Sequence, residues 1–161
     1  MSFRIGQGID FHKLVEGREF WLGGILIPHS KGALGHSDAD VLLHAICDAL
    51  LGALSLGDIG QHFPDTDAAY KGIDSKVLLQ KCYELVTEKG YTLVNIDSTI
   101  LLQAPKIRKY VDEMRNTIAA ILHVAPDAVS IKATTTEQLS FIGREEGIVA
   151  TANVLLQKIT A

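Results

Sequence analysis

The chain has 161 residues, of which 47% are hydrophobic and 21% are charged, with a formal net charge of -4. That length suits one catalytic domain with a real core, spanning residues 1–161, and is short for two. No apolar run approaches the roughly 20 residues of a membrane-spanning helix, so we expect no membrane partner. The acidic balance, without any basic block, also argues against nucleic acid as a partner.

The first residues carry no sign of a targeting segment. They pass directly into strand-like sequence, with neither an apolar signal core nor an Arg- and Ser-rich transit segment. The two cysteines, Cys47 and Cys82, both lie within apolar helical patterns, which favours buried free thiols over a disulfide or a metal pair. We therefore expect a cytoplasmic protein in a reducing compartment.

Apolar periodicity and turn residues predict the elements in chain order. These are a strand at 3–10, a hairpin at 19–28, helices at 38–54 and 75–89, a strand at 91–103, a helix from 106 to 124, and strands at 129–133 and 147–159. Ser37 would cap the first helix, and Gly57 and Gly90 would end the first and second helices. The polar loop between these two helices is long enough to be functional.

This order of elements predicts an α/β fold of the α+β type, with one mixed sheet and helices packed on one face. The strands at 91–103 and 147–159 are apolar at alternate positions, yet only three helices are available to cover the sheet. Either self-association or the loops would cover the other face, and the pattern favours neither.

Asp10 and His12 stand two residues apart in a predicted strand, so both side chains point the same way. Taken alone, such a pair is usually a surface Asp and His at a strand end. His44 lies among core-type residues, where a half-buried histidine bonded to a backbone carbonyl is the ordinary meaning. Together the three offer the donor set of a catalytic zinc site with an open fourth position. Asp48, one turn after His44, would either orient its ring or be solvated.

Two further segments carry groups suited to phosphate. At 35–38, His36, Ser37 and the free N–H groups of a helix start form a candidate anion site, which is compatible with ordinary capping by Ser37. At 132–137, three consecutive threonines precede Glu137. They either reflect strand propensity alone, or bind phosphate oxygens while Glu137 holds a hard ion such as Mg²⁺.

Six motifs follow one another along the chain: G-x-G-x-D-x-H, G-H-S-D-A-D-V-x-x-H-A-x-x-D-A-L-L-G-A, G-D-I-G, F-P-D-T-D, Q-A-P-K and K-A-T-T-T-E. They span nearly the whole chain and resemble the 2-C-methyl-D-erythritol 2,4-cyclodiphosphate synthase family. The resemblance implies a phosphorus–oxygen lyase that cyclises 4-diphosphocytidyl-2-C-methyl-D-erythritol 2-phosphate and releases CMP, in the non-mevalonate route to isoprenoid precursors. It also implies a homotrimer whose sheets face the threefold axis, with active sites between subunits.

The same resemblance assigns roles to individual residues. The metal ligands would be Asp10, His12 and His44 for Zn²⁺, and Glu137 for a second divalent ion, Mg²⁺ or Mn²⁺. The catalytic residues, which stabilise the transition state, would be His36 and Thr135. The erythritol and phosphate loop would be Asp58, Ile59, Gly60, Phe63, Asp65 and Asp67. The cytidine pocket, from a neighbouring subunit, would be Ala104, Pro105, Lys106, Ala133 and Thr134. Further substrate contacts would be Asp10, His12, His36, Ser37, Thr135, Thr136, Glu137, Phe141 and Arg144.

The sequence departs from the family pattern at Gln7, Ser140 and Glu145, where a histidine, a glycine and a small residue are common. None of these is a proposed ligand, although Ser140 bears on the backbone of its loop. Two competing interpretations are a zinc phosphohydrolase, which generates hydroxide at the open position, and a metal-buffering or sensing domain without nucleotide affinity. The chain lacks the P-loop, H-E-x-x-H and G-x-S-x-G motifs, so the common nucleotide-fold and hydrolase routes have no support.

Overall fold

The computed structural model describes residues 2–64, 66, 70 and 72–159. The strands are β1 (Phe3–Glu16), β2 (Phe20–Leu22), β3 (Ile25–Ile27), β4 (Lys31–Leu34), β5 (Tyr91–Leu101), β6 (Val129–Thr134) and β7 (Gly147–Lys158). The α-helices are α1 (Val41–Ala53), α2 (Ile59–His62), α3 (Ser75–Glu88), α4 (Val111–Ile121) and α5 (Ser140–Gly143). Two 3₁₀ turns, η2 (Arg108–Tyr110) and η3 (Pro126–Ala128), flank α4.

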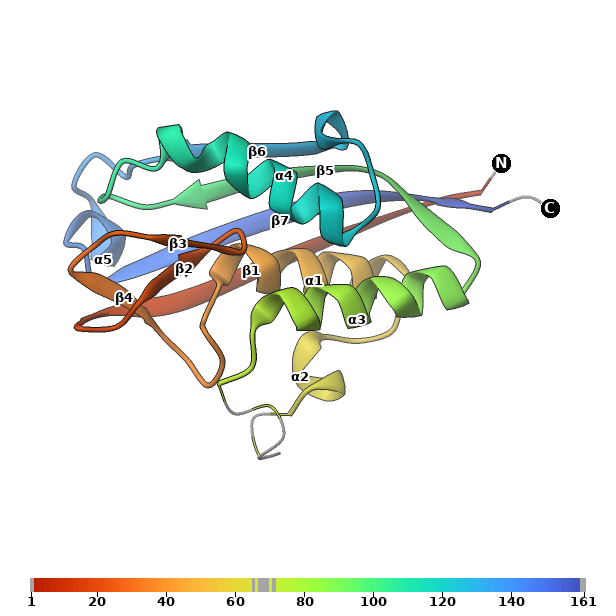
Figure 1. The fold of residues 1–161 in the computed structure, drawn as a ribbon, viewed down its shortest axis with the longest axis horizontal. Coiled ribbons are helices and arrows are strands. Elements are labelled where there is room, and N and C mark those ends of the chain that lie inside the picture. The colour runs from red at the N-terminus through yellow and green to blue at the C-terminus, as the bar shows by residue number, and fades with distance from the viewer. Residues whose placement is uncertain (1, 65, 67–69, 71, 160–161) are drawn as a thin grey trace.

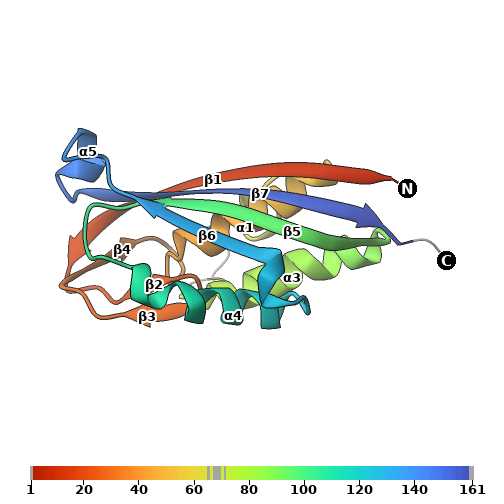
Figure 2. The ribbon, with the colours of Figure 1, turned by 90° about the horizontal axis from the view of Figure 1, so that it is seen from above.

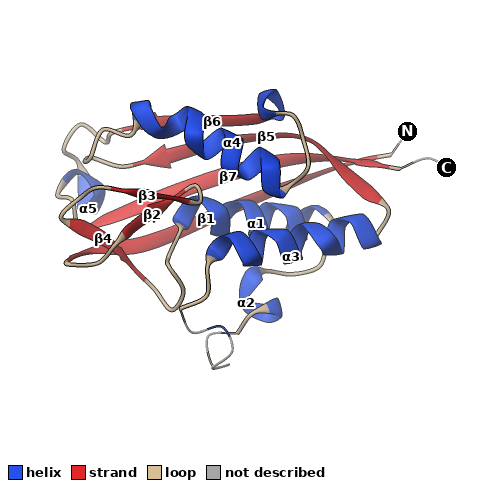
Figure 3. Ribbon diagram, viewed as in Figure 1, coloured by secondary structure: helices blue, strands red, loops and turns tan. Residues whose placement is uncertain are grey.

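The main sheet has five strands in the order β4-β1-β7-β5-β6, and β2 and β3 form a separate hairpin. β7 pairs antiparallel with β1 and β5, whereas β6 runs parallel to β5, so the sheet is mixed, as the order of elements predicted. Helices α1, α3 and α4 lie across one face of this sheet (Figure 1). Figure 2 shows β6, β5, β7 and β1 side by side from another direction. In Figure 3, α2 and α5 stand apart from this helical layer.

Helix α1 lies directly on β1 because two glycines leave room for it. A Cβ atom at Gly6 would lie 1.9 Å from the carbonyl oxygen of Ala49, and one at Gly8 would lie 2.0 Å from that of Ala45. α3 packs against α1, which is buried along most of its length. Although α1 is largely apolar, neither it nor any other helix in the described part of the chain is long and apolar enough to cross a bilayer. The close contact fixes α1 relative to β1.

The opposite face of β1 presents large apolar side chains to solvent. Phe3, Ile5, Ile9 and Phe11 alternate along this face and are between 49% and 80% exposed. Their neighbours at even positions point toward α1, as strand alternation requires. A single chain therefore leaves this apolar face of β1 exposed, whereas the strand pattern had left open whether loops or self-association would cover it.

The start of α1 differs from the prediction. Ser37 does not cap a helix from residue 38: α1 begins at Val41, and the Asp40 carboxylate accepts a hydrogen bond of 3.1 Å from the Leu43 N–H. The same carboxylate accepts hydrogen bonds from the N–H groups of Gly23, at 3.0 Å, and Gly24, at 2.7 Å. Burial raises the pKa of Asp40, and these three N–H groups oppose that rise. Asp40 thus joins the hairpin turn to the helix.

Other elements differ in extent. β1 continues six residues beyond the predicted end at Asp10, because its second half pairs with β4, a short strand that the sequence pattern did not predict. The helices α2 and α5 were also missed, since each has only four residues. The longer predicted strands and helices are confirmed, although α4 spans Val111–Ile121 within the predicted range of 106–124 and follows the 3₁₀ turn η2.

Candidate metal centre

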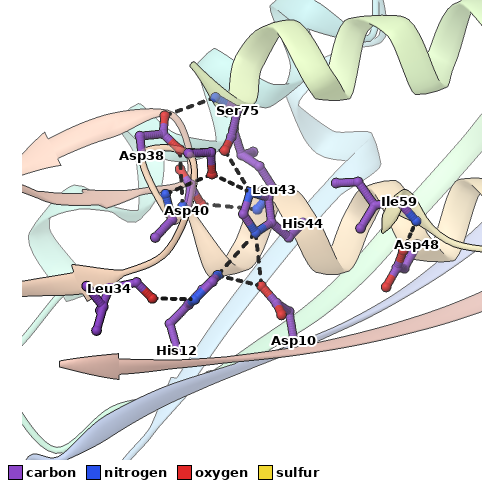
Figure 4. A network of polar contacts seen from close by, with 12 residues as sticks. Asp10, His12, Leu34, Asp38, Asp40, Leu43, His44, Asp48, Ile59 and Ser75 are labelled. Carbon is purple, nitrogen blue, oxygen red and sulfur yellow. Dashed lines mark hydrogen bonds and ion pairs between the residues drawn. The ribbon is translucent and has the colours of Figure 1, made fainter. Parts of the chain in front are cut away.

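The structure brings together the three residues that the sequence singled out as metal ligands. Asp10 and His12 project from β1 and His44 from the first turns of α1 (Figure 4). His12 Nε2 lies 3.0 Å, and His44 Nδ1 3.1 Å, from Asp10 Oδ2. The two nitrogens are 3.2 Å apart. All three side chains are between 13% and 25% exposed, so this tripod is sheltered but reachable.

The remaining nitrogen of each histidine ring has its own partner. His12 Nδ1 lies 3.0 Å from the carbonyl oxygen of Leu34, which can only accept, so Nδ1 donates to it. His44 Nε2 lies 2.8 Å from the hydroxyl of Ser75 and 3.2 Å from that of Ser37. One carboxylate and two imidazoles converging in this way are the donors that Zn²⁺ takes in catalytic sites, so the residues fit that ion.

The charges of the tripod also suit a cation. Burial raises the pKa of Asp10, but hydrogen bonds from His12 and His44 outweigh it and hold the pKa well below its usual range. Burial lowers the pKa of His44, but the hydrogen bond and charge of Asp10 outweigh it and raise the pKa above its ordinary value. At neutral pH the Asp10 carboxylate is therefore ionised at the point where the two imidazoles meet.

A cavity of about 450 Å³ opens beside the tripod. Its walls include predicted site residues from the segments before α1 and around α2, namely His36, Ser37, Ile59, Gly60 and Phe63. Asp58 instead caps α2, since its side chain accepts a hydrogen bond of 3.0 Å from the Gln61 N–H. Asp65 and Asp67 lie outside the described residues.

Asp48 does not orient the ring of His44, which was one of two interpretations of its position. Its carboxylate accepts a hydrogen bond of 2.8 Å from the Ile59 N–H. Burial raises the pKa of Asp48, and the Ile59 N–H opposes that rise. Asp48 therefore holds the backbone at the start of α2, beside the cavity. The side chain beside Nε2 of His44 is that of Ser75 instead.

A second, smaller hollow of about 180 Å³ lies at the end of β5 and β6. Predicted cytidine-pocket residues line it: Pro105, Lys106, Ala133 and Thr134, together with Thr135. Ala104 directly precedes them in the chain. No residue is shared between the linings of this hollow and of the tripod cavity. Within one chain, His36 and Thr135 therefore line different cavities.

The last predicted contacts lie around α5. Phe141 lines a separate cavity of about 550 Å³ together with Phe11, His12 and Lys13, and it does not line the cavity beside the tripod. The Arg144 guanidinium donates to Glu146 at 3.0 Å, and this pair raises the pKa of Arg144. Glu137 is exposed and accepts a hydrogen bond of 3.1 Å from the Thr135 hydroxyl. The Thr136 hydroxyl donates to the Leu139 carbonyl at 2.6 Å.

Ser140 departs from the family pattern, and its backbone shows the consequence. Its φ is 62°, in the left-handed region that favours glycine. Close by, a Cβ at Gly143 would lie 2.1 Å from the carbonyl carbon of Gln138. The turn before β7 is therefore tight, and a side chain at position 140 is accommodated at some cost in backbone strain.

The fold and the tripod together define an α/β protein with a candidate metal centre of two histidines and one carboxylate beside a cavity. The YgbB family model matches residues 3–157, and the chain belongs to the YgbB family. That match includes all the tripod and cavity residues described above.

Named relatives and solved structures agree with this membership. A relative from Bacteroides thetaiotaomicron, named 2-C-methyl-D-erythritol 2,4-cyclodiphosphate synthase, is 59% identical over 98% of this chain and 99% of its own length. One of the same name from Bacillus mycoides is 59% identical over 97% and 99%. The structure resembles the CDP complex of IspF from Plasmodium falciparum, with a TM-score of 0.87 and 34% identity over 99% of this chain and 98% of that one.

The bifunctional IspDF from Campylobacter jejuni is similar over part of its length. Its TM-score is 0.95 at 41% identity, and the match covers 98% of this chain but 43% of that one. The chain is thus similar to whole synthases and to one part of a longer enzyme.

Proposed function

We propose that the chain converts 4-diphosphocytidyl-2-C-methyl-D-erythritol 2-phosphate into 2-C-methyl-D-erythritol 2,4-cyclodiphosphate and CMP, as a phosphorus–oxygen lyase of isoprenoid precursor biosynthesis. One observation carries the proposal: the tripod of Asp10, His12 and His44 is assembled beside a cavity in a chain 59% identical to proteins named for this reaction. The substrate is a cytidine diphosphate compound, and one solved relative is described as a CDP complex.

In this reaction an oxygen of the substrate's 2-phosphate attacks its β-phosphorus in line. A new P–O bond forms, the bond from the β-phosphorus to the oxygen of the CMP phosphate breaks, and CMP leaves with that electron pair. No protein nucleophile is needed. Both reacting groups belong to one molecule, so holding it folded supplies part of an effective molarity of about 10⁵–10⁸ M. The work of the chain is to position the substrate and neutralise its charge.

Asp10, His12 and His44 would hold Zn²⁺, and Glu137 would hold Mg²⁺ or Mn²⁺. Bound there, such ions would polarise the diphosphate and offset its negative charge. His36, exposed at the tripod cavity, and Thr135, in the second hollow, donate hydrogen bonds to oxygens on which charge develops.

The other parts of the substrate are assigned to segments of the chain around these cavities. The erythritol and its phosphate contact the segment with Asp58, Ile59, Gly60, Phe63, Asp65 and Asp67. The cytidine contacts Ala104, Pro105, Lys106, Ala133 and Thr134. Further substrate contacts come from Ser37, Thr136, Phe141 and Arg144.

The active form is a homotrimer with its sheets turned toward the threefold axis. Two observations support this: β1 exposes an apolar face, and the tripod cavity and the second hollow are separate within one chain. In the trimer the second hollow of one subunit completes the tripod cavity of its neighbour. The sheet face is then buried, which removes an apolar surface that water would disfavour.

Mixed trimers test this shared site. His44→Ala removes a tripod ligand, and Lys106→Ala removes a cytidine contact, so each variant alone is expected to be impaired. Refolding them together at equal amounts regenerates intact sites at roughly a quarter of the interfaces, with a matching recovery of activity. A mixture no more active than its components would refute the shared site.

The compartment proposed is the cytoplasm. Cys47 and Cys82 are both buried free thiols, a state that persists in a reducing environment. Fractionation of the native host, with an antibody to the chain, tests this assignment. Recovery in an exported fraction would contradict it.

The reaction itself is tested by ³¹P NMR on the purified chain with substrate and both ions. The expected product is a cyclic diphosphate with one equivalent of CMP. A linear monophosphate would instead indicate a zinc phosphohydrolase. Failure of CDP to raise the melting temperature, together with tight zinc binding, would favour a metal-buffering domain.

Thr135→Ala distinguishes a role in the transition state from a role in binding. This variant should lower turnover more than it weakens CDP affinity, because the proposed contact strengthens as charge develops. CDP affinity is measured by calorimetry on the same preparation. An equal loss in both quantities would remove Thr135 from the catalytic pair.

A further inference from the structure

His44 is held on the side away from the tripod by a residue that no motif had indicated. Its Nδ1 faces Asp10 and His12, and its Nε2 lies 2.8 Å from the hydroxyl of Ser75 at the start of α3 (Figure 4). Ser75 is fully buried. The Ser75 hydroxyl also makes a short hydrogen bond to the Asp38 carboxylate. The three side chains form a chain of contacts that ends at the tripod.

The direction of these hydrogen bonds can be worked out from Asp38. Its carboxylate accepts hydrogen bonds from two backbone N–H groups, that of Asp40 at 3.2 Å and that of Ser75 at 2.9 Å. A carboxylate holding these donors acts as an acceptor, so the Ser75 hydroxyl gives its one hydrogen to Asp38. The oxygen of Ser75 then has only lone pairs left for His44. His44 Nε2 must therefore carry a proton.

Ser37 is the alternative partner for the same nitrogen. Its oxygen lies 3.2 Å from His44 Nε2 and already accepts the Ala39 N–H at 3.0 Å. Ser75 is closer, and its hydroxyl hydrogen is directed by a charged acceptor, which makes its oxygen a stronger acceptor in turn. Ser75 therefore dominates the contact with His44.

We infer that Ser75 and Asp38 are positioning residues of the metal centre. They keep a proton on Nε2 of His44 and hold the ring in one orientation, so that Nδ1 is the nitrogen that faces Asp10 and His12. This inference rests on the proposed function only in that the tripod binds a divalent metal. Groups that hold the far nitrogen of a ligand histidine are worth roughly 10–100-fold in metal affinity.

The test measures metal binding without substrate. Zn²⁺ affinity is obtained by competition with a chromophoric chelator, and the visible absorption of the Co²⁺ form reports the geometry around the ion. Ser75→Ala should lower Zn²⁺ affinity by roughly 10–100-fold and change the Co²⁺ spectrum. Asp38→Asn, which keeps the side-chain shape, should act in the same direction. The double variant should lose little more than Ser75→Ala alone, because the residues act as a unit.

Ser98→Ala is the matched control. Ser98 is 1% exposed, and its hydroxyl donates to the Ser130 carbonyl at 2.8 Å, far along the chain from the tripod ligands. The Ser98→Ala variant loses a buried hydroxyl and some stability, as Ser75→Ala does. It should nevertheless keep the Zn²⁺ affinity and the Co²⁺ spectrum of the wild type. The positioning role of Ser75 and Asp38 is overturned if Ser75→Ala and Asp38→Asn both bind Zn²⁺ within twofold of the wild type. It is also overturned if Ser98→Ala loses as much Zn²⁺ affinity as they do. If the variants lose Zn²⁺ affinity as expected but the wild-type chain forms no cyclic diphosphate, the positioning role is supported and the proposed reaction is overturned.

Discussion

Replacing Gly8 with alanine should damage the metal centre more than the fold. The added Cβ would lie 2.0 Å from the carbonyl oxygen of Ala45, whereas real Cβ atoms essentially never come within 3.0 Å of such an atom. Both atoms belong to backbone, so no side chain can rotate away. The cheapest response is for α1 to move off β1 by about 1 Å, since close-packed interiors transmit such strain.

The size of the effect follows from what α1 carries. Overpacking of this kind costs about 1–3 kcal/mol, and each kcal/mol lowers the melting temperature of a chain of this size by about 2–4 °C. The metal centre is less tolerant, because ligand distances must agree within about 0.2 Å. His44 precedes Ala45 on the displaced helix, so its Nδ1, now 3.1 Å from Asp10 Oδ2, would move away from the ligands on β1.

Thermal melting in EDTA and competitive Zn²⁺ titration measure the two effects of Gly8→Ala separately. Gly52→Ala is the control, because it adds the same methyl group to α1 where the nearest atom is 3.8 Å away. It should bind Zn²⁺ normally and gain up to about 1 kcal/mol in stability from helix propensity. Wild-type Zn²⁺ affinity in Gly8→Ala would refute the idea that this close contact sets the geometry of the tripod.

Three other changes have defined outcomes. Asp40→Ala should lower the free energy of unfolding in urea by about 3–5 kcal/mol, because it removes the α1 cap and leaves the N–H groups of Gly23 and Gly24 buried without partners; a loss under 1 kcal/mol would contradict this. Ser140→Gly should add about 0.5–1 kcal/mol by relieving its left-handed backbone, and unchanged urea unfolding would argue against strain there. Zn²⁺ at 1,000 times its dissociation constant should stabilise the chain by about 4 kcal/mol in calorimetry, and His44→Ala should abolish that gain while remaining folded.

The tripod was predictable because its three residues together form one donor set among the six motifs, although each part alone has a commoner structural meaning. Asp10 and His12 share a face of a strand, and His44 is a polar residue in an apolar helix. Strand alternation likewise indicated an apolar sheet face that the helices do not cover, without deciding what covers it, and the order of elements predicted the mixed sheet. These inferences depend on periodicities of two and 3.6 residues, which the long elements obey.

The support around the tripod was not predictable from such signals. Ser37, Asp38 and Asp40 are all capping-type residues before the same helix, and only the packing of the hairpin turn on α1 selects Asp40. Ser75 lies 31 residues beyond His44, so no spacing rule connects them. The partner of Asp48 is equally non-local, because the bend before α2 decides which backbone N–H reaches it.

The pairing of β1 with β7 has a consequence for biosynthesis. These strands are in register from Phe3 opposite Gln157 to Lys13 opposite Gly147, so the strand with two metal ligands has its main partner at the far end of the chain. At a rate of about 5–20 residues per second, the ribosome synthesises β7 roughly 5–20 s after His44. Until then α1 has only part of its sheet to pack against, and the nascent chain exposes apolar surface suited to chaperones. Metal capture therefore belongs to the finished chain, and a chain truncated before β7 should leave the ribosome without a usable site.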